Sequence, residues 1–178
     1  ISACLVGSEM CIRDRYTPLT LSPLNRRFEK LGATAEHFDM AGLDYRFRKQ
    51  WLARVHVAQL QDIYRQQVFT LVNKSPWGAG TFSSDLRLSL MNDYGNAKGG
   101  KIDNRALQGL LGYAYKGHSL GLTYQRMLGD TGYANILGTD ANLINLSVLG
   151  DFANAKERSW ALRLSLIHIS EPTRQAEI

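Results

Sequence analysis

The sequence has no long hydrophobic run. Among its 178 residues, no uninterrupted apolar stretch approaches the roughly 20 residues of a membrane-spanning helix. This absence excludes transmembrane helices but not membrane strands, which need only about 9–11 residues and alternate polar with apolar side chains. The composition, 44% hydrophobic and 21% charged, is ordinary for a folded chain.

Motifs for catalysis, phosphate binding and metal binding are also scarce. The sequence has no H-E-x-x-H motif and no P-loop Gly-Lys-Ser/Thr, and Gly99-Gly100 follows a loop pattern rather than a strand. We therefore expect no enzyme activity, no cofactor and no metal. The net charge of +5 suits a nucleic-acid binder or an anion-attracting pore. No helix-turn-helix, zinc or RNA-recognition pattern accompanies the basic residues, so nucleic acid is not an expected partner.

Cysteine is confined to Cys4 and Cys11, in a segment that we expect to be foreign to the fold. Residues 164–174 can be written as DNA whose reverse complement, read one base in, translates as residues 5–14. A single DNA segment read in both directions therefore explains both ends, and it resembles an untrimmed adapter from sequencing-library preparation. We expect residues 1–15 and 164–178 to be adapter-derived, so neither cysteine indicates a disulfide or a metal site.

The remaining chain shows the period-2 alternation of half-buried strands. Residues 16–38 lack a clean period and are expected to form loop with a partial strand. From residue 39 to 163 the pattern predicts an all-β, antiparallel sheet of about seven strands. The predicted strands cover residues 41–47, 51–57, 67–73, 84–91, 104–115, 119–125 and 159–163.

The connections between these strands differ in length, which favours a membrane barrel over a soluble sandwich. Tight turns such as residues 48–50 and 116–118 contrast with the long excursion over residues 128–157. Bacterial outer-membrane barrels have short periplasmic turns and longer extracellular loops. Aromatic residues gather at the predicted strand ends, among them Tyr45, Trp51 and Trp77, where a membrane interface would place them.

Several runs resemble the OprD family of outer-membrane porins. The most distinctive are Gly-Leu-Thr-Tyr-Gln-Arg-Met-Leu-Gly-Asp-Thr-Gly at 121–132 and Gly-Asp-Phe-Ala-Asn-Ala-Lys-Glu-Arg-Ser-Trp at 150–160. Shorter runs at 42–47, 59–66, 84–87 and 100–107 occur in the family's order and spacing. The resemblance implies a transmembrane barrel of the porin type in the outer membrane of a Gram-negative bacterium, surrounded by lipid. It also implies diffusion of small carboxylates or amino acids past wall arginines and inward-folded loops. Oligomeric state is left open between monomer and trimer.

If the apolar faces meet lipid, one set of arginines faces the lumen. A guanidinium facing lipid at mid-membrane would cost about 2–4 kcal/mol, which favours this assignment. The pore-lining and substrate-contact candidates are Arg46, Arg54, Arg87 and Arg163. The alternative is that these arginines pair with Asp44, Asp85 or Asp62 and only brace the wall.

The long excursion supplies candidates for a constriction: Asp130, Tyr133 and Asp140. Acidic groups opposite arginines would suit a zwitterionic or basic amino acid as substrate. A different class of function also fits the alternation: a soluble or surface β-sheet domain for binding or adhesion, without transport. In that case one strand face would pack a core, and the long loops would form the recognition surface.

Overall fold

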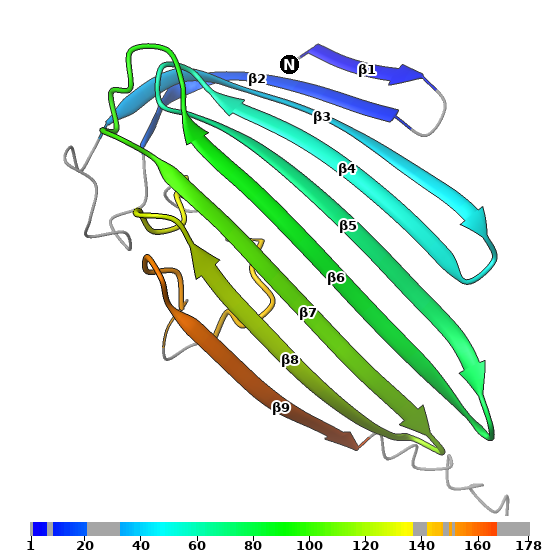
Figure 1. Cartoon of the computed structure of the whole chain (residues 1–178). Coiled ribbons are helices and arrows are strands. Elements are labelled where there is room, and N and C mark those ends of the chain that lie inside the picture. The colour runs from blue at the N-terminus through cyan, green and yellow to red at the C-terminus, as the bar shows by residue number, and fades with distance from the viewer. Residues whose placement is uncertain are drawn as a thin grey trace, which may run out of the picture.

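The computed structural model describes residues 2–6, 9–20, 33–136, 142–147, 150 and 152–166. All strands belong to one antiparallel sheet in which neighbours in sequence are neighbours in space (Figure 1). The strands are β1 (Ser2–Val6), β2 (Glu9–Thr20), β3 (Thr34–Arg48), β4 (Trp51–Leu60), β5 (Tyr64–Trp77), β6 (Gly80–Asp93), β7 (Asp103–Tyr115), β8 (His118–Leu128) and β9 (Arg158–Leu166). The described part of the chain contains no helix long and apolar enough to cross a membrane.

The all-β prediction is confirmed, and β3 to β9 are the seven expected strands, each longer than its alternating pattern. The sheet also includes β1 and β2, which lie mostly in residues 1–15, where no element was expected. The physical reason is the exposed edge of β3, whose unpaired N–H and C=O groups accept any adjacent extended segment. Likewise, β9 continues to Leu166 because residues 164–166 preserve its alternation.

The two ends of the sheet differ in their connections. At one end, the tight-turn end, pairs of residues join β3 to β4, β5 to β6 and β7 to β8. In the last of these, Lys116 and Gly117 both have positive φ, 44° and 77°, as the type I′ turn of a right-twisted hairpin requires. At the opposite end, the long-connection end, the links are residues 61–63, 94–102 and 129–157.

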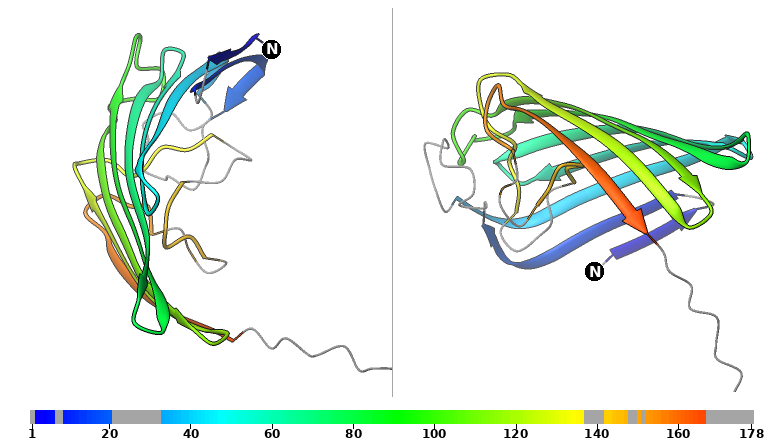
Figure 2. Two further views of the ribbon diagram at one scale, coloured as in Figure 1. Left: turned by 90° about the vertical axis from the view of Figure 1, so that its right-hand side faces the viewer. Right: turned by 90° about the horizontal axis from the view of Figure 1, so that it is seen from below.

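The sheet is strongly curved, and the described part of the 129–157 loop lies on its concave side (Figure 2). Between this loop and the wall at the long-connection end is a small hydrophobic core. Its buried members are Ala35, Leu60, Tyr64, Met91, Ala106 and Met127 from the strands, Ile63 and Ile102 from the two shorter connections, and Tyr133, Ala134, Ile136 and Leu143 from the long loop. This core fixes the loop against the concave face.

The convex face is apolar and uncovered by any described segment. Its exposed side chains include Leu43, Val55, Phe69, Leu86, Leu88, Leu107, Leu111, Leu120, Leu122, Leu162 and Leu164. Leu162 alone is 65% exposed. A contiguous apolar surface of this extent is a liability in water and marks a face that meets another apolar phase.

Candidate functional site

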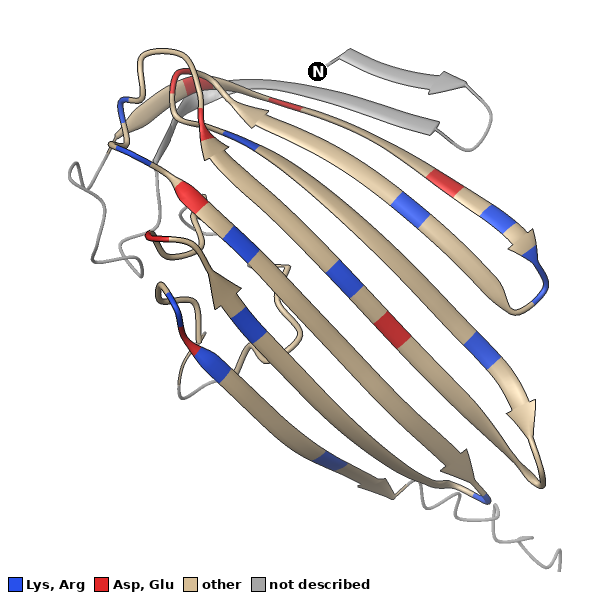
Figure 3. Cartoon of the chain, in the orientation of Figure 1, with Lys and Arg blue, Asp and Glu red and all other residues tan. Residues whose placement is uncertain are grey.

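A row of polar residues crosses the concave face. Directly paired residues of neighbouring strands share a face, so strand register defines the row. In order from β3 to β9 it consists of Asp44, Arg54, Thr70, Arg87, Gln108, Gln125 and Ser159. Figure 3 shows that basic and acidic positions are interspersed along these strands. Two of the four predicted pore-lining arginines thus lie in one register row.

Arg54 is an exposed member of the row. Its Nε donates to Asp44 Oδ2 at 2.9 Å, and His56 Nε2 lies 3.6 Å from the other oxygen of that carboxylate. The Arg54 side chain remains 44% exposed. An ion pair this open to solvent is weak, so the guanidinium keeps donors for a passing anion.

Arg87 is held from two sides. Its Nε and Nη2 donate to the two carboxylate oxygens of Asp85 at 3.0 and 2.6 Å, which is a bidentate pair. Its Nη1 donates to Asn142 Oδ1, in the loop, at 2.7 Å. Arg87 therefore connects the wall to the loop as well as contributing charge.

Two glutamines of the sheet form hydrogen bonds with the loop backbone. Gln108 Oε1 accepts from Ile144 N at 2.8 Å, and Gln125 Oε1 accepts from Asn145 N at 3.2 Å. Gln125 Nε2 also donates to Phe152 O at 3.1 Å. Both glutamines are essentially fully buried. Because a buried amide without partners costs about 1–3 kcal/mol, their hydrogen bonds specify the position of the loop.

Arg163 and Tyr133 are also loop anchors. Arg163 Nη2 donates to the backbone oxygen of Ile144. Tyr133 is buried, and its hydroxyl accepts from Gln66 Nε2, which also donates to Ser89 Oγ at 3.0 Å. Burial raises the pKa of the Tyr133 phenol, so it stays protonated and neutral in the core. Tyr133 thus ties the loop to the wall rather than lining open space.

The remaining predicted residues lie apart. Asp130 forms an exposed ion pair with Lys156 at 3.2 Å, near the strand end of the loop. Asp140 lies outside the described residues. Arg46 is exposed where the β3–β4 register shifts, and no described residue forms a hydrogen bond or ion pair with its side chain. The structure therefore groups Arg54, Arg87 and Arg163 around the row and loop, and places Arg46 toward the tight-turn end.

Sequence reasoning missed one basic residue of this surface, Lys74. It is exposed, and it follows Thr70 and Val72 in alternation, so it lies on the concave face of β5. The prediction ended that strand at residue 73. Extending the predicted strand by one residue, to position 74, would have placed Lys74 on this face. Among the described residues, the basic side chains of the concave face of the strands are then Arg46, Arg54, Lys74, Arg87 and Arg163, with Asp44 and Asp85 between them.

A pattern of the nucleophile-elbow type, G-x-S-x-G, occurs at residues 117–121. In the structure it spans the tight β7–β8 turn and the start of β8. The elbow requires a strand followed by a helix, which this hairpin lacks. Ser119 pairs in the sheet with Ser165, and it has no hydrogen bond to a histidine in the described part of the chain. The pattern is thus a hairpin sequence.

The chain matches known families over most of its length. Residues 16–168 match the family model described as outer membrane porin, OprD family. The chain is 30% identical over 138 residues to the porin-like protein GalP of Pseudomonas putida, covering 76% of this chain and 34% of that protein. It is 30% identical over 145 residues to porin D of Pseudomonas aeruginosa, covering 76% of this chain and 33% of that protein. The chain thus spans about a third of the length of these relatives.

Solved structures match the fold closely. OccK5 (OpdH) of Pseudomonas aeruginosa superposes with a TM-score of 0.84 at 38% identity, over 89% of this chain and 45% of that one. OccK11 (OpdR) of the same species gives 0.84 at 40% identity, with the same coverage. OccAB3 of Acinetobacter baumannii gives 0.80 at 29% identity, over 89% of this chain and 42% of that one.

Proposed function

Because the chain belongs to the OprD family of outer membrane porins, we propose that the protein is a diffusion channel for small polar solutes. The chain is part of an outer-membrane protein of a Gram-negative bacterium, and its relatives are channels rather than enzymes. In this setting the convex face meets lipid and the concave face lines the water-filled lumen, as in porin barrels. The soluble binding-domain alternative would leave the apolar convex face uncovered.

We further propose carboxylates and amino acids as the solutes, with basic amino acids favoured. The observation that carries this is the polar row, in which Arg54 lies next to Asp44. Beyond the row, the side chains of Arg46 and Lys74 are exposed and have no partner in the described part of the chain. A guanidinium matches a carboxylate in geometry, and several weak sites in series let an anion move from one to the next. Asp44 supplies the opposite charge that the ammonium or guanidinium group of a substrate needs.

The long loop narrows the path beside the row. It lies on the concave face and is held by Arg87, Gln108, Gln125 and Arg163. The Gln108, Gln125 and Arg163 contacts hold the loop backbone, and the Arg87 contact holds the Asn142 side chain. We propose that the constriction lies between this loop and the wall segment around Arg54.

The test is solute flux through the full-length protein in liposomes. Arginine and benzoate are expected to enter faster than a neutral sugar of similar size. The double variant R46Q/R54Q should lose most of the benzoate advantage while sugar entry is unchanged. The variant R65Q, which removes a charge from the convex face, is the matched control and should behave as wild type. Equal rates for the charged solutes and the sugar in the wild-type protein would refute the proposal.

A further inference from the structure

The convex face has a second group of charges, remote from the concave row. Four arginines, Arg65, Arg105, Arg126 and Arg158, lie toward the long-connection end. Arg126 is paired directly with Arg158, whereas its neighbour Gln125 faces the loop. Arg105 pairs with Leu128, two residues beyond Arg126, and therefore shares its face. We call these four residues the arginine band.

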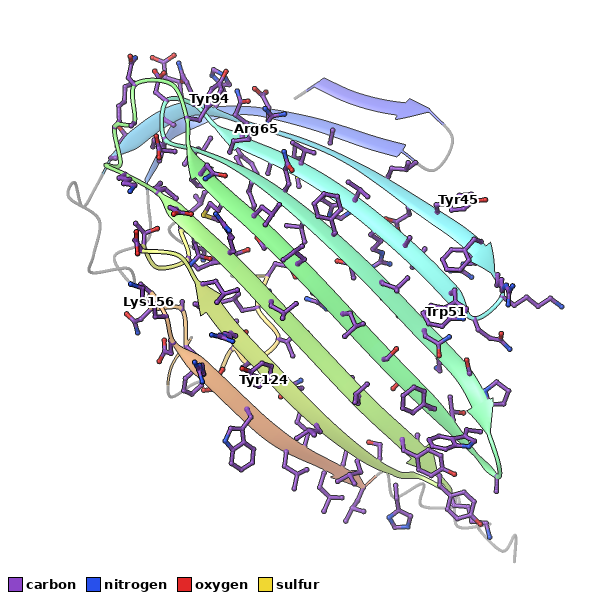
Figure 4. The ribbon with its side chains drawn as sticks, in the orientation of Figure 1. Tyr45, Trp51, Arg65, Tyr94, Tyr124 and Lys156 are labelled. Atoms are coloured by element: carbon purple, nitrogen blue, oxygen red, sulfur yellow. The ribbon has the colours of Figure 1, made fainter. Side chains whose placement is uncertain are left out.

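The band follows the tilt of the strands. Arg158 and Arg126 share one register row, and Arg105 lies two residues further toward the strand end on β7. On β5, Arg65 pairs with Asn92, two residues beyond the Leu90 that pairs with Arg105. Because barrel strands are tilted, residues at one membrane depth shift along the register from each strand to the next, as these arginines do. Figure 4 shows Arg65 and Tyr124 among the side chains of this face.

The band lies where the apolar surface ends. Tyr124 and Trp160 are paired on the convex face, two residues before the Arg126–Arg158 pair. On β7, Tyr113 of the tight-turn end is eight residues from Arg105. Eight residues span about 27 Å of strand, or about 20 Å of height at a tilt of about 40°. The apolar band of an outer-membrane barrel is about 25 Å tall, so the arginines lie near its edge.

The side chains of the band form no ion pair and no hydrogen bond with the described part of the chain. The nearby acidic residues have other roles: Asp130 pairs with Lys156, and Glu157 accepts from Asn154 at 2.8 Å. Asp103, on the same face as Arg105, makes no ion pair. Like charges directly opposite each other are destabilising, so an external anion bound between Arg126 and Arg158 would stabilise this pair of strands.

We propose that the arginine band binds the phosphate groups of an anionic, phosphate-bearing glycolipid in the adjoining membrane leaflet. Guanidinium groups bind phosphate oxygens through two parallel N–H···O bonds, and several of them together select a lipid bearing more than one phosphate. The acyl chains of such a lipid would lie along the leucines of β6 to β9, beside Tyr124 and Trp160. The site goes beyond the proposed channel function and does not depend on its selectivity.

The test measures lipid binding to the full-length protein in detergent by native mass spectrometry. The probes are bisphosphorylated lipid A, the same glycolipid without its phosphates, and phosphatidylglycerol. Wild-type protein is expected to retain lipid A at least ten times more strongly than the dephosphorylated form. The variant R126Q/R158Q should lose at least tenfold in lipid A binding, and R126K/R158K should recover part of it. Millimolar inorganic phosphate should compete poorly, since the lipid supplies the apolar contacts.

The control variant is R48Q/K49Q, which removes two charges at the tight-turn end. It should bind lipid A as wild type does. All variants should keep wild-type single-channel conductance, which shows that they are folded and separates this proposal from the channel proposal. Equal binding of phosphorylated and dephosphorylated glycolipid, or undiminished binding by R126Q/R158Q, would overturn the arginine band as a phosphate site.

Discussion

At the scale of single residues, Gly129 controls how the chain leaves β8 for the long loop. Its φ is +103°, and a Cβ at this position would lie 2.4 Å from the backbone oxygen of Asp103. Both features exclude a side chain. We expect Gly129→Ala to destabilise the full-length protein by about 1–3 kcal/mol, measured as a lower temperature of heat-induced unfolding.

The matched control for this substitution is Gly121→Ala, also on β8. Its Cβ would approach no atom closer than 3.8 Å. It should cost far less than Gly129→Ala. If the two variants unfold at the same temperature, the close passage at Gly129 is not what fixes the start of the loop.

Asp62 joins the two shorter connections of the long-connection end. Its Oδ1 accepts from Asn96 N at 3.3 Å, and Lys98 Nζ lies 3.2 Å from Oδ2. The Asn96 hydrogen bond and the Lys98 contact hold the pKa of the Asp62 carboxyl below its usual range. A depressed pKa means that the contact stabilises the loop above the unfolded-state pKa and is lost as pH falls through the folded-state pKa.

We therefore expect the Asp62 carboxyl to titrate below an ordinary aspartate in a carbon-13 NMR titration of the full-length protein. The variant K98A should move its pKa upward but not fully to normal, because the Asn96 amide still donates. An Asp62 carboxyl that titrates normally in the wild-type protein would contradict this account of the clamp.

At the scale of elements, the long loop depends on buried amides of the wall. Replacing Gln108 and Gln125 by leucine leaves the backbone groups of Ile144, Asn145 and Phe152 without their partners. Each lost buried hydrogen bond costs about 1–3 kcal/mol, so the loop should detach from the wall. In planar bilayers, Q108L/Q125L should show larger or noisier single-channel currents than wild type.

Gln67 gives a control of the same residue type on the opposite face of the wall. It pairs with Val57 and Leu90, which places it on the convex side, away from the loop. The variant Q67L should conduct as wild type does. Unchanged current in Q108L/Q125L would mean that the loop position does not set the width of the path.

At the scale of the whole molecule, alternation in the sequence was sufficient to predict the sheet but not its contacts. The alternation in residues 41–47, 84–91 and 119–125 predicted which face of each strand is apolar, because successive side chains of a strand point to opposite faces. Register was needed to place Asp44, Arg54 and Arg87 in one row, and sequence periodicity contains no register. The anchoring roles of Tyr133 and Gln125 depend on where the loop returns, which is set by packing with no local signal. Lys74 was missed because its strand was predicted too short, and Arg65, Arg126 and Arg158 of the arginine band likewise lie outside the predicted strands.

The origin of the two ends of the chain is proposed from the sequence alone. We propose that residues 1–15 and 164–178 are translated adapter DNA, and that residues 39–163 form the partial barrel wall. Adapter-trimmed sequencing of the source locus should replace both ends by new porin sequence, with further strand pairs. An intact locus that encodes Cys4 and Cys11 in frame would refute this.

The central claim is that the concave face is wet and the convex face meets lipid. Spin labels at neighbouring positions of β5 test it most directly, since Thr70 lies in the polar row and Leu71 on the opposite face. The full-length protein in lipid vesicles would carry Thr70→Cys or Leu71→Cys, each labelled and measured by electron paramagnetic resonance. The label at position 70 should be relaxed by a water-soluble nickel chelate, and the label at position 71 by oxygen dissolved in the lipid. The reverse pattern, or equal access of the nickel chelate to both positions, would contradict the account.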